Sequence, residues 1–258
     1  MRAFFATVYI IWLRDVKRFV REGTRILAML GQPLLYLLIM GQGLRSAFRM
    51  NIPGFDYLGF VYPGVIGMSV LFTAIFSSVS IIWDKQFGFL KEVLVAPVPR
   101  ASIAMGKALG GSTTACIQGI ILLILAPFAG VSLGFGQIMA LAGLMFTMAF
   151  AVASLGTLVA ARMETMEGFH LITNFLTLPM FLLSGAFFPL KTAPAWMQPI
   201  MRIDPVFYGV DALRNVIYSG SPVRHFAVAQ TVTVDVLVLL VFSFVMVSLG
   251  MLAFSRTE

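Results

Sequence analysis

Long apolar stretches without any charged residue dominate the chain and alternate with short charged segments. Most are close to the about 20 residues that a helix needs to cross a hydrocarbon core of about 30 Å. One is long enough for two helices and breaks near residues 127–136. The charge-free stretches are 26–44, 57–83, 108–161, 169–190 and 236–255. The pattern therefore predicts six membrane-spanning helices, at 25–44, 58–82, 102–126, 137–161, 169–188 and 227–254.

Composition supports a membrane protein, because 59% of the residues are hydrophobic, only 11% are charged, and the mean hydropathy is +0.95. In lipid, every backbone polar group needs an internal hydrogen bond, so only helices or a closed barrel can span. Apolar runs of this length lack the polar alternation of a barrel strand. We therefore expect an all-α integral membrane protein that forms a single domain over residues 1–258.

Residues 1–22 predict an amphipathic helix at the cytoplasmic interface. Apolar residues recur at spacings of three and four, and basic residues fill the opposite side. Neither an apolar central core nor a small-residue cleavage site marks a signal peptide. A plain membrane anchor and a collar that moves with the first span remain equally supported. The apolar face is Phe4, Phe5, Val8, Ile11, Trp12, Val16 and Phe19, and the basic face is Arg14, Lys17, Arg18 and Arg21.

Positive charge is distributed unevenly across the predicted topology. With a cytoplasmic amino terminus, twelve of the 18 Lys and Arg residues fall on the inside and six on the outside. This excess predicts that both termini are cytoplasmic and that the protein lies in the inner (cytoplasmic) membrane. The net charge of +7 is then explained by the membrane surface, and we expect no nucleic-acid partner.

The residue types used in catalysis and metal binding are too scattered to form a site. His170 and His225 fall on opposite sides of the predicted membrane. Glu164, Glu167 and His170 share a helical face, which leaves a metal site conceivable, but a solvated inner loop is the favoured interpretation. Cys116 is the single cysteine and lies within a span. We expect no catalytic residue and no metal site.

The string Gly106-Lys107 resembles a fragment of a phosphate-binding loop. The glycine expected five residues earlier is absent, Ala108 replaces the required Ser or Thr, and no strand precedes it. The chain therefore has no ATPase motif and no cofactor of its own.

The inner segment 83–100 mixes charged and apolar residues at helical spacing and ends at Pro97 and Pro99. A short amphipathic helix here would either dock into a groove of a soluble partner or cover lipid headgroups. The residues of interest are Asp84, Lys85, Phe87, Leu90, Lys91, Glu92 and Arg100.

The outer segment 189–224 is divided by four prolines into short helical stretches. Broken helices at membrane depth are tolerated only where they face protein or water, so the segment is either a set of surface helices or a re-entrant pair that closes a path from outside. Asp211 and Arg214 are three residues apart, a spacing that allows an ion pair. The prolines are Pro189, Pro194, Pro199 and Pro205, and the aromatic residues among them include Trp196, Phe207 and Tyr208.

Two further features lie inside the spans. Ser102, Gly106, Gly110 and Thr114 form a small-residue stripe that allows close helix packing, within one subunit or between two. Asp235 lies about two turns into the last span, where an ionisable group marks a functional site by default. A hydrated or threonine-bonded aspartate beside Thr231 and Thr233 is the favoured interpretation.

The order of these features resembles the membrane subunits of ABC type-2 exporters, which include drug-resistance, nodulation-factor and polysaccharide or lipid export permeases. The resemblance covers nearly the whole chain. It rests on the amino-terminal helix, on Tyr62-Pro63-Gly64, on Trp83-Asp84-Lys85 through Leu90-Lys91-Glu92 to Pro99-Arg100, on Leu183-Ser184-Gly185 with Phe188-Pro189-Leu190, and on Asp204-Pro205 with Asp211-Ala212-Leu213-Arg214. Asparagine is common in the family where this chain has Asp204.

The resemblance implies two six-span subunits, expected as a homodimer, joined by two copies of a cytoplasmic ATPase that binds ATP and Mg²⁺. The loop around Lys91 and Glu92 would insert into the ATPase, and the outer segment would act as a gate for an amphiphilic substrate. The implied coupling residues are Asp84, Lys85, Phe87, Leu90, Lys91, Glu92 and Arg100. The implied gate residues are Pro189, Trp196, Asp204, Pro205, Tyr208, Asp211 and Arg214.

Two other classes of function compete with this interpretation. A membrane enzyme acting on lipid would need clustered polar groups at one depth, and the spans carry almost none. A secondary carrier or channel without an ATPase commonly shows internal repeats and midplane ionisable residues. Asp235 is the one feature of the sequence that favours a carrier or channel.

Overall fold

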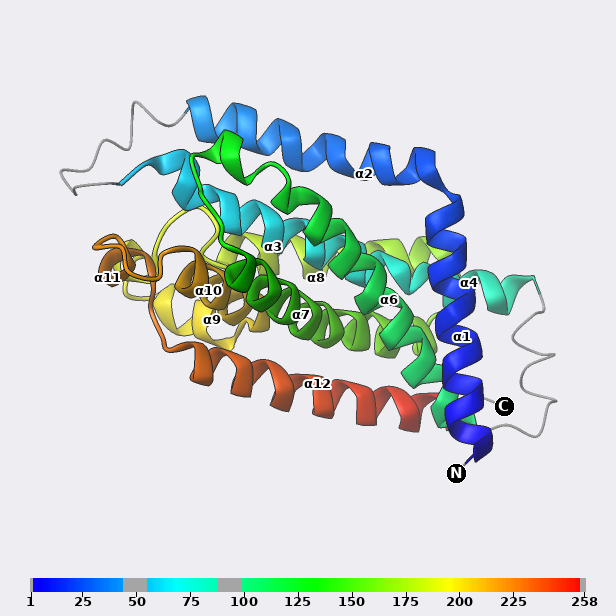
Figure 1. Cartoon of the computed structure of the whole chain (residues 1–258). Coiled ribbons are helices and arrows are strands. Elements are labelled where there is room, and N and C mark those ends of the chain that lie inside the picture. The colour runs from blue at the N-terminus through cyan, green and yellow to red at the C-terminus, as the bar shows by residue number, and fades with distance from the viewer. Residues whose placement is uncertain (1, 44–54, 88–98, 256–258) are drawn as a thin grey trace.

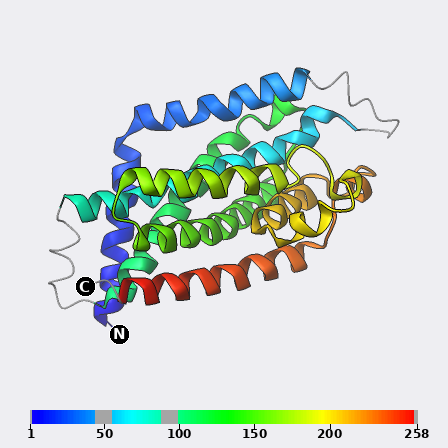
Figure 2. The ribbon, with the colours of Figure 1, turned by 180° about the vertical axis from the view of Figure 1, so that it is seen from behind.

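The structure is a computed structural model that describes residues 2–43, 55–87 and 99–255. Every regular element in these ranges is a helix. Six helical segments run roughly along one common direction, as Figures 1 and 2 show from opposite sides. They are α2 (Gly23–Tyr36) continued by the π-helical η1 (Leu37–Gln42), α3 (Tyr57–Ser77) continued by α4 (Val79–Gln86), α6 (Arg100–Leu123), α7 (Phe135–Arg162), α8 (Met166–Leu183) and α12 (Val232–Ser255).

The two ends of this bundle differ. The amphipathic α1 (Arg2–Arg21) lies across one end of the long helices, close to the end of α12 (Figure 1). Short helices form the opposite end: η2 (Ala126–Ala129), η3 (Leu190–Thr192), α9 (Gln198–Ile203), α10 (Pro205–Ile217) and α11 (Arg224–Ala227). We refer to the two ends as the inner and the outer end, in keeping with the predicted topology.

Helix α3 forms the centre of the bundle. Its residues are buried all around the helix, including Val61, Val70, Leu71 and Ala74, which have no exposed surface. A helix that is hydrophobic on every face is stable only when other helices surround it. Pro63 lies inside α3, and the Tyr62 hydroxyl donates a hydrogen bond to the Leu122 carbonyl of α6 at 3.0 Å.

Four stretches of the described chain are long and apolar enough to cross a membrane: Tyr57–Gln86, Phe135–Arg162, Met166–Leu183 and Arg224–Ser255. Of the other two expected spans, 25–44 corresponds to α2 with η1, and 102–126 corresponds to α6. In the described part of the first of these, the apolar helical stretch is Leu30–Ile39, which is shorter than a full span. Helix α6 is long enough but is rich in Gly, Ser and Thr and carries Lys107, which lowers its hydropathy.

Two expected spans end or begin elsewhere in the structure. Helix α8 ends at Leu183 rather than at residue 188, because Ser184 and Gly185 form a turn in which Gly185 has φ +75°. This left-handed conformation suits glycine and terminates helices. The last span begins at Val232 rather than at 227, because residues Arg224–Ala227 form the separate α11.

Large apolar side chains remain exposed on the outward faces of α8 and α12. Phe175 is 82% exposed and Phe244 is 75% exposed. Such surface is the kind that lipid covers in a membrane protein, because hydrocarbon chains are as apolar as these side chains. The exposed apolar faces of α8 and α12 therefore agree with a helical membrane protein.

Candidate functional site

The inner end is held together by α1 lying across α6. The small-residue stripe of α6 faces α1: a Cβ at Gly106 would come within 2.9 Å of the Ile11 side chain, and one at Gly110 within 3.0 Å of the Asp15 side chain. The Trp12 indole donates to the Thr113 hydroxyl at 2.9 Å. The glycines therefore allow α1 to approach α6 closely within one subunit. Ser102, in the first turn of the same helix, is fully buried.

Four charged residues meet at this contact, and we call them the inner charge cluster: Arg14, Asp15, Asp84 and Lys107. Lys107 Nζ lies 2.8 Å from Asp84 Oδ2 and 3.3 Å from Asp15 Oδ2. Arg14 Nη2 lies 2.6 Å from the same Asp84 oxygen. The Lys107 side chain is 3% exposed, and those of Asp15 and Asp84 are each 13% exposed. The cluster joins α1, α4 and α6 through one carboxylate.

Lys107 also donates a hydrogen bond to the Ser80 hydroxyl at 2.9 Å, so its ammonium group is surrounded by acceptors. A buried cation is tolerated only when paired and hydrogen-bonded in this way. The alternating signs of the cluster bring the net charge of the contact close to zero.

The neighbouring Lys85 is bound to the end of a different helix. Its Nζ donates to the carbonyls of Ala160, Ala161 and Met163 at 3.1, 2.8 and 2.9 Å. These carbonyls lie at the carboxyl end of α7, where unpaired carbonyls and the helix dipole favour a cation. Lys85 therefore fixes the end of α4 against the end of α7.

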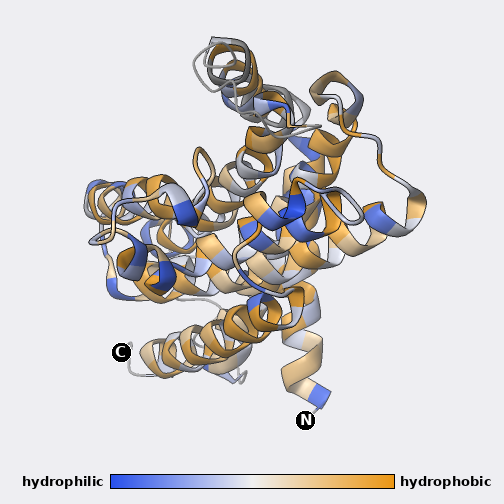
Figure 3. Cartoon of the chain, turned by 90° about the vertical axis from the view of Figure 1, so that its left-hand side faces the viewer, coloured by the Kyte–Doolittle hydropathy of each residue, from blue (hydrophilic) through white to orange (hydrophobic). Residues whose placement is uncertain are grey.

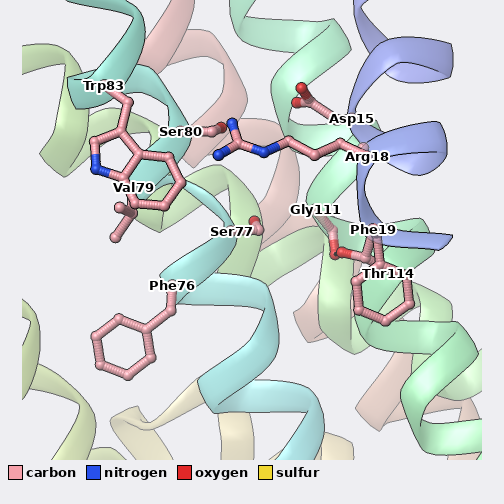
Figure 4. A pocket seen from close by; sticks show the side chains of 11 residues that line it. Asp15, Arg18, Phe19, Phe76, Ser77, Val79, Ser80, Trp83, Gly111 and Thr114 are labelled. Carbon is pink, nitrogen blue, oxygen red and sulfur yellow. Dashed lines mark hydrogen bonds between the residues drawn. The ribbon is translucent and has the colours of Figure 1, made fainter. Parts of the chain in front are cut away.

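A small cavity lies beside the cluster, and Figure 4 shows its lining side chains. Arg18 of α1 extends across it, and its guanidinium carbon lies 4.6 Å from the centre of the Trp83 ring of α4. Such a cation–π contact contributes roughly 0.5–1 kcal/mol at an exposed site. Phe19 and Phe76 line the apolar side. This contact is a second link between α1 and α4.

The predicted coupling residues therefore divide into three groups. Asp84 and Lys85 point into contacts within the chain, whereas Phe87 is 83% exposed at the end of the described α4 segment. Arg100 begins α6 and donates to the Ser255 carbonyl at the end of α12 at 3.3 Å. Leu90, Lys91 and Glu92 lie outside the described residues.

At the outer end, Asp204 begins the helix α10. Its Oδ1 accepts a hydrogen bond from the Val206 amide at 2.9 Å, which is the bond expected of an N-cap aspartate before Pro205. Its Oδ2 is buried without a hydrogen-bond partner among the described residues. Burial raises the pKa of Asp204 to about 8, and the Val206 hydrogen bond opposes that shift.

We expect the stability of the wild-type protein to fall as the pH rises from about 4 to about 8, in part because of Asp204. The folded state binds the Asp204 proton more tightly than the unfolded state, so the contribution is complete below the unfolded pKa and is lost as the pH passes the folded pKa. Asp204→Asn keeps the cap and removes this titration. Its unfolding temperature in detergent should therefore fall less than that of the wild type over this range. Glu167→Gln, which removes an exposed carboxyl, is the control and should show the same change of unfolding temperature with pH as the wild type. If the unfolding temperatures of Asp204→Asn and the wild type changed equally with pH, the raised pKa of Asp204 would be contradicted.

The expected ion pair between Asp211 and Arg214 is wrong. Asp211 instead accepts hydrogen bonds from the backbone amides of Ala229, at 2.9 Å, and Gln230, at 2.7 Å, just before α12. Burial raises the pKa of Asp211, and these amides lower it. The two backbone amides bind the carboxylate directly, and the guanidinium of Arg214 is directed to other elements.

Arg214 is 2% exposed and binds to α3 and to the turn after α8. Its Nη2 donates to the Ala186 carbonyl at 3.0 Å, and its guanidinium carbon lies 3.9 Å from the centre of the Phe60 ring. Burial lowers the pKa of Arg214 to about 10, so it remains a cation at neutral pH. Arg214 therefore connects α10 to the outer end of α3.

The other predicted gate residues lie in the same outer segment. Pro189 precedes η3, and Trp196 is 68% exposed in the connection to α9. The Tyr208 hydroxyl donates to the Arg202 carbonyl at 2.8 Å. The structure thus brings Asp204, Tyr208, Asp211 and Arg214 together on one short helix and its cap, with Trp196 directed outward.

Asp235 of α12 is fully buried, and neither carboxylate oxygen has a hydrogen-bond partner among the described residues. The threonine-bonded interpretation is therefore wrong. Asn215 faces this region but donates its amide hydrogen to the Gln230 carbonyl at 2.9 Å.

The sequence pattern does not predict the roles of Arg14, Asp15 and Lys107. It places Arg14 on the basic face of the amino-terminal helix and singles out Lys107 only as part of the Gly106-Lys107 string. One signal was available: an ionisable residue beyond the first turn of a predicted span implies a partner of opposite charge.

The chain is similar to transport permeases along most of its length. A family model described as ABC-2 type transporter matches residues 6–218. The inner membrane transport permease YadH of Escherichia coli is 28% identical over 83% of this chain and 84% of its own length. Nodulation protein J of Rhizobium meliloti is 28% identical over 78% of this chain and 76% of its own length. The matched region includes the inner charge cluster and the outer helices α9 and α10.

Proposed function

Because the chain belongs to the ABC-2 type transporter family, it is a transmembrane subunit of an ABC transporter, and we propose that it exports an amphiphilic substrate with energy from a separate ATPase. The chain supplies the membrane path, and two copies of a cytoplasmic ATPase supply ATP hydrolysis. Drugs, lipids and glycolipids or polysaccharides are the substrate classes proposed. A second copy of this chain completes the path as a homodimer.

The proposed topology has six spans with both termini in the cytoplasm of an inner-membrane protein. Four spans are supported by length and hydropathy, and α2 with η1 and α6 would supply the other two. The first and last helices of the described chain approach each other at the inner end (Figure 2), as an even number of spans requires. The excess of basic residues at that end supports its cytoplasmic side.

The observation that carries the proposal is the connection of the predicted coupling segment to the bundle. The segment leaves α4 after Phe87 and returns at the start of α6. Asp84 and Lys107, on these two flanking helices, share the inner charge cluster with α1. A displacement of the segment by an ATPase would therefore act on α1, α4 and α6 together. Transmission of this kind requires packed elements with two arrangements.

The outer segment is proposed to close the path from outside. Helix α10 is bound to the centre of the bundle through Arg214 and to the start of α12 through Asp211. Movement of either span would therefore be transmitted to α10. The short helices divided by prolines suit a gate, because they can rotate without breaking a long helix.

Glu92→Lys is expected to abolish coupled transport and to weaken co-purification of the ATPase, because it reverses a charge in the proposed docking helix. The measurement is affinity purification of the full chain in mild detergent from the native host, with quantification of any co-eluting ATPase and of its turnover. Membrane insertion, followed by the amount of folded protein in the membrane, should stay unchanged.

Glu167→Lys is the matched control, since Glu167 is exposed on the same predicted side of the membrane in the first turn of α8. It should leave ATPase recovery and turnover as in the wild type. Normal recovery with Glu92→Lys would refute the docking assignment. Failure of the wild type itself to recover any ATPase would refute the ATP-driven mechanism.

A further inference from the structure

The outer end of the molecule holds a cleft that the gate assignment does not use. It has a volume of about 780 Å³ and lies between η3, the end of α10, α11 and the residues before α12. Figure 3 looks onto this end and shows hydrophilic positions gathered among mainly hydrophobic helices. The polar residues around the cleft are Lys191, Asn215, Ser221, Arg224, His225 and Gln230.

Basic side chains from two elements meet around this cleft. Lys191 comes from η3, whereas Arg224 and His225 come from α11. Within the described ranges, neither Lys191 nor Arg224 forms an ion pair. Among the residues that the structure describes, no carboxylate lines the cleft. Two cations that converge on one open cleft without a counter-ion favour an anionic ligand.

Arg224 is held in place by a buried neighbour. Its Nε and Nη2 both donate to Asn215 Oδ1, at 3.2 and 3.0 Å. Asn215 is 2% exposed and is itself fixed by its hydrogen bond to the Gln230 carbonyl. In the part of the chain that the structure describes, Nη1 of Arg224 makes no hydrogen bond. A guanidinium fixed on one edge and open on the other is suited to an anion with several oxygens.

Lys191 is fixed in a similar way, because its ammonium group donates to the His225 backbone carbonyl. This bond draws η3 toward α11 and leaves further donors on the same nitrogen. Asp211 lies near Lys191, whose charge helps to lower the pKa of the Asp211 carboxyl, and its oxygens accept hydrogen bonds from the amides of Ala229 and Gln230. Asp211 is not among the residues that line the cleft, and it forms no ion pair with Lys191 in the described part of the chain.

Exposed apolar residues of the same outer segment support a position near the lipid headgroups. Trp196, Ile200 and Ile203, in and just before α9, are exposed by 68%, 42% and 80%. Exposed tryptophan and aliphatic residues beside basic ones are typical of the membrane–water interface. A phosphate group at that depth would reach both Lys191 and Arg224 from the outer leaflet.

We propose that the cleft formed by Lys191, Arg224 and His225 binds a phosphate group, carried by an anionic phospholipid of the outer leaflet or present as free phosphate. The proposal takes only the side of the membrane from the proposed function and needs neither the ATPase nor transport. Its test is therefore a binding measurement on the full chain alone.

The first experiment is native mass spectrometry of the full chain in detergent, titrated with phosphatidylglycerol or phosphatidylcholine. The wild type should retain phosphatidylglycerol preferentially. The double variant Lys191→Gln with Arg224→Gln should bind it about tenfold or more weakly, since two charge-assisted contacts are lost. Arg202→Gln is the matched control, because Arg202 is an exposed basic residue of the same outer segment outside the cleft. It should bind as the wild type does.

Two further arms keep the result interpretable. Lys191→Gln alone leaves the contact of Arg224 with Asn215 intact and should still weaken phosphatidylglycerol binding several-fold. Lys191→Arg keeps the positive charge and should bind phosphatidylglycerol as the wild type does. In the second arm, inorganic phosphate is added during thermal unfolding in detergent. Saturable stabilisation by phosphate that the double variant lacks, without preference for phosphatidylglycerol, would assign the site to free phosphate. If the double variant bound phosphatidylglycerol and inorganic phosphate as strongly as the wild type does, the proposal would be overturned.

Discussion

Replacing Lys107 by methionine is expected to lower the free energy of unfolding by about 3–5 kcal/mol, the usual effect of removing one partner from a buried ion pair. Methionine matches the length of the lysine stem, so the loss would come from the missing charge. The change leaves Asp84 and Asp15 largely buried with only Arg14 to neutralise them. It also removes the donor that binds the Ser80 hydroxyl.

The measurement is reversible unfolding in detergent, followed by circular dichroism with added denaturant. Lys17→Met is the matched control, because Lys17 is exposed on α1 and the substitution is the same. It should change the free energy by less than about 0.5 kcal/mol. Adding Asp84→Asn to Lys107→Met should recover part of the loss, because it removes one unpaired carboxylate. Equal losses for Lys107→Met and Lys17→Met would contradict the existence of the inner charge cluster.

Gly64→Ala is expected to destabilise the protein by about 1–3 kcal/mol, as overpacking of a filled core does. A Cβ at this position would lie 2.6 Å from both carbon atoms Cα and Cβ of Ala186 and 2.8 Å from its carbonyl oxygen. The neighbour cannot simply rotate away, because the close atoms belong mainly to backbone. The same carbonyl accepts the hydrogen bond of the buried Arg214, so any shift of Ala186 would disturb α10 as well.

Gly143→Ala provides the control within a membrane-spanning helix. Gly143 is exposed on α7, and a Cβ there would meet nothing within 4 Å. The substitution should be neutral or stabilising by roughly 0.5–1 kcal/mol, since alanine is the better helix former. Thermal unfolding of both variants in the same detergent measures the difference. A Gly64→Ala protein as stable as Gly143→Ala would contradict the close approach of α3 to the turn after α8.

Much of the helical architecture was predictable because lipid imposes a simple rule on the sequence. A membrane-spanning helix needs a long apolar run, and its ends fall where charges, prolines or glycines appear. Thus the run at 137–161 corresponds to α7, and the amphipathic pattern at 1–22 corresponds to α1. The predicted end of α8 lies five residues too late, because the residues after Gly185 are again apolar and extend the charge-free run to residue 190, although Gly185 itself ends the helix.

The candidate site was less predictable because its contacts join residues far apart in the chain. Asp84 was assigned to an ATPase contact from its place in the inner segment, but its carboxylate binds Arg14 and Lys107. The spacing of Asp211 and Arg214 permits a pair on one helix, yet each has a partner on another element. Helical spacing says which residues share a face, and it does not say what the neighbouring helix offers to that face.

The sequence by itself determined the class of protein, the long helices, the amphipathic α1 and the family. These depend on local patterns of apolar and charged residues, which are read within one or two helical turns or within one span. Tertiary structure alone decided that Gly106 and Gly110 pack against α1, that Lys107 is neutralised by two carboxylates, and that Lys191 and Arg224 meet around one cleft. Those outcomes depend on the relative placement of several helices, because a buried charge or a close backbone approach is stable only when the opposite element supplies its complement.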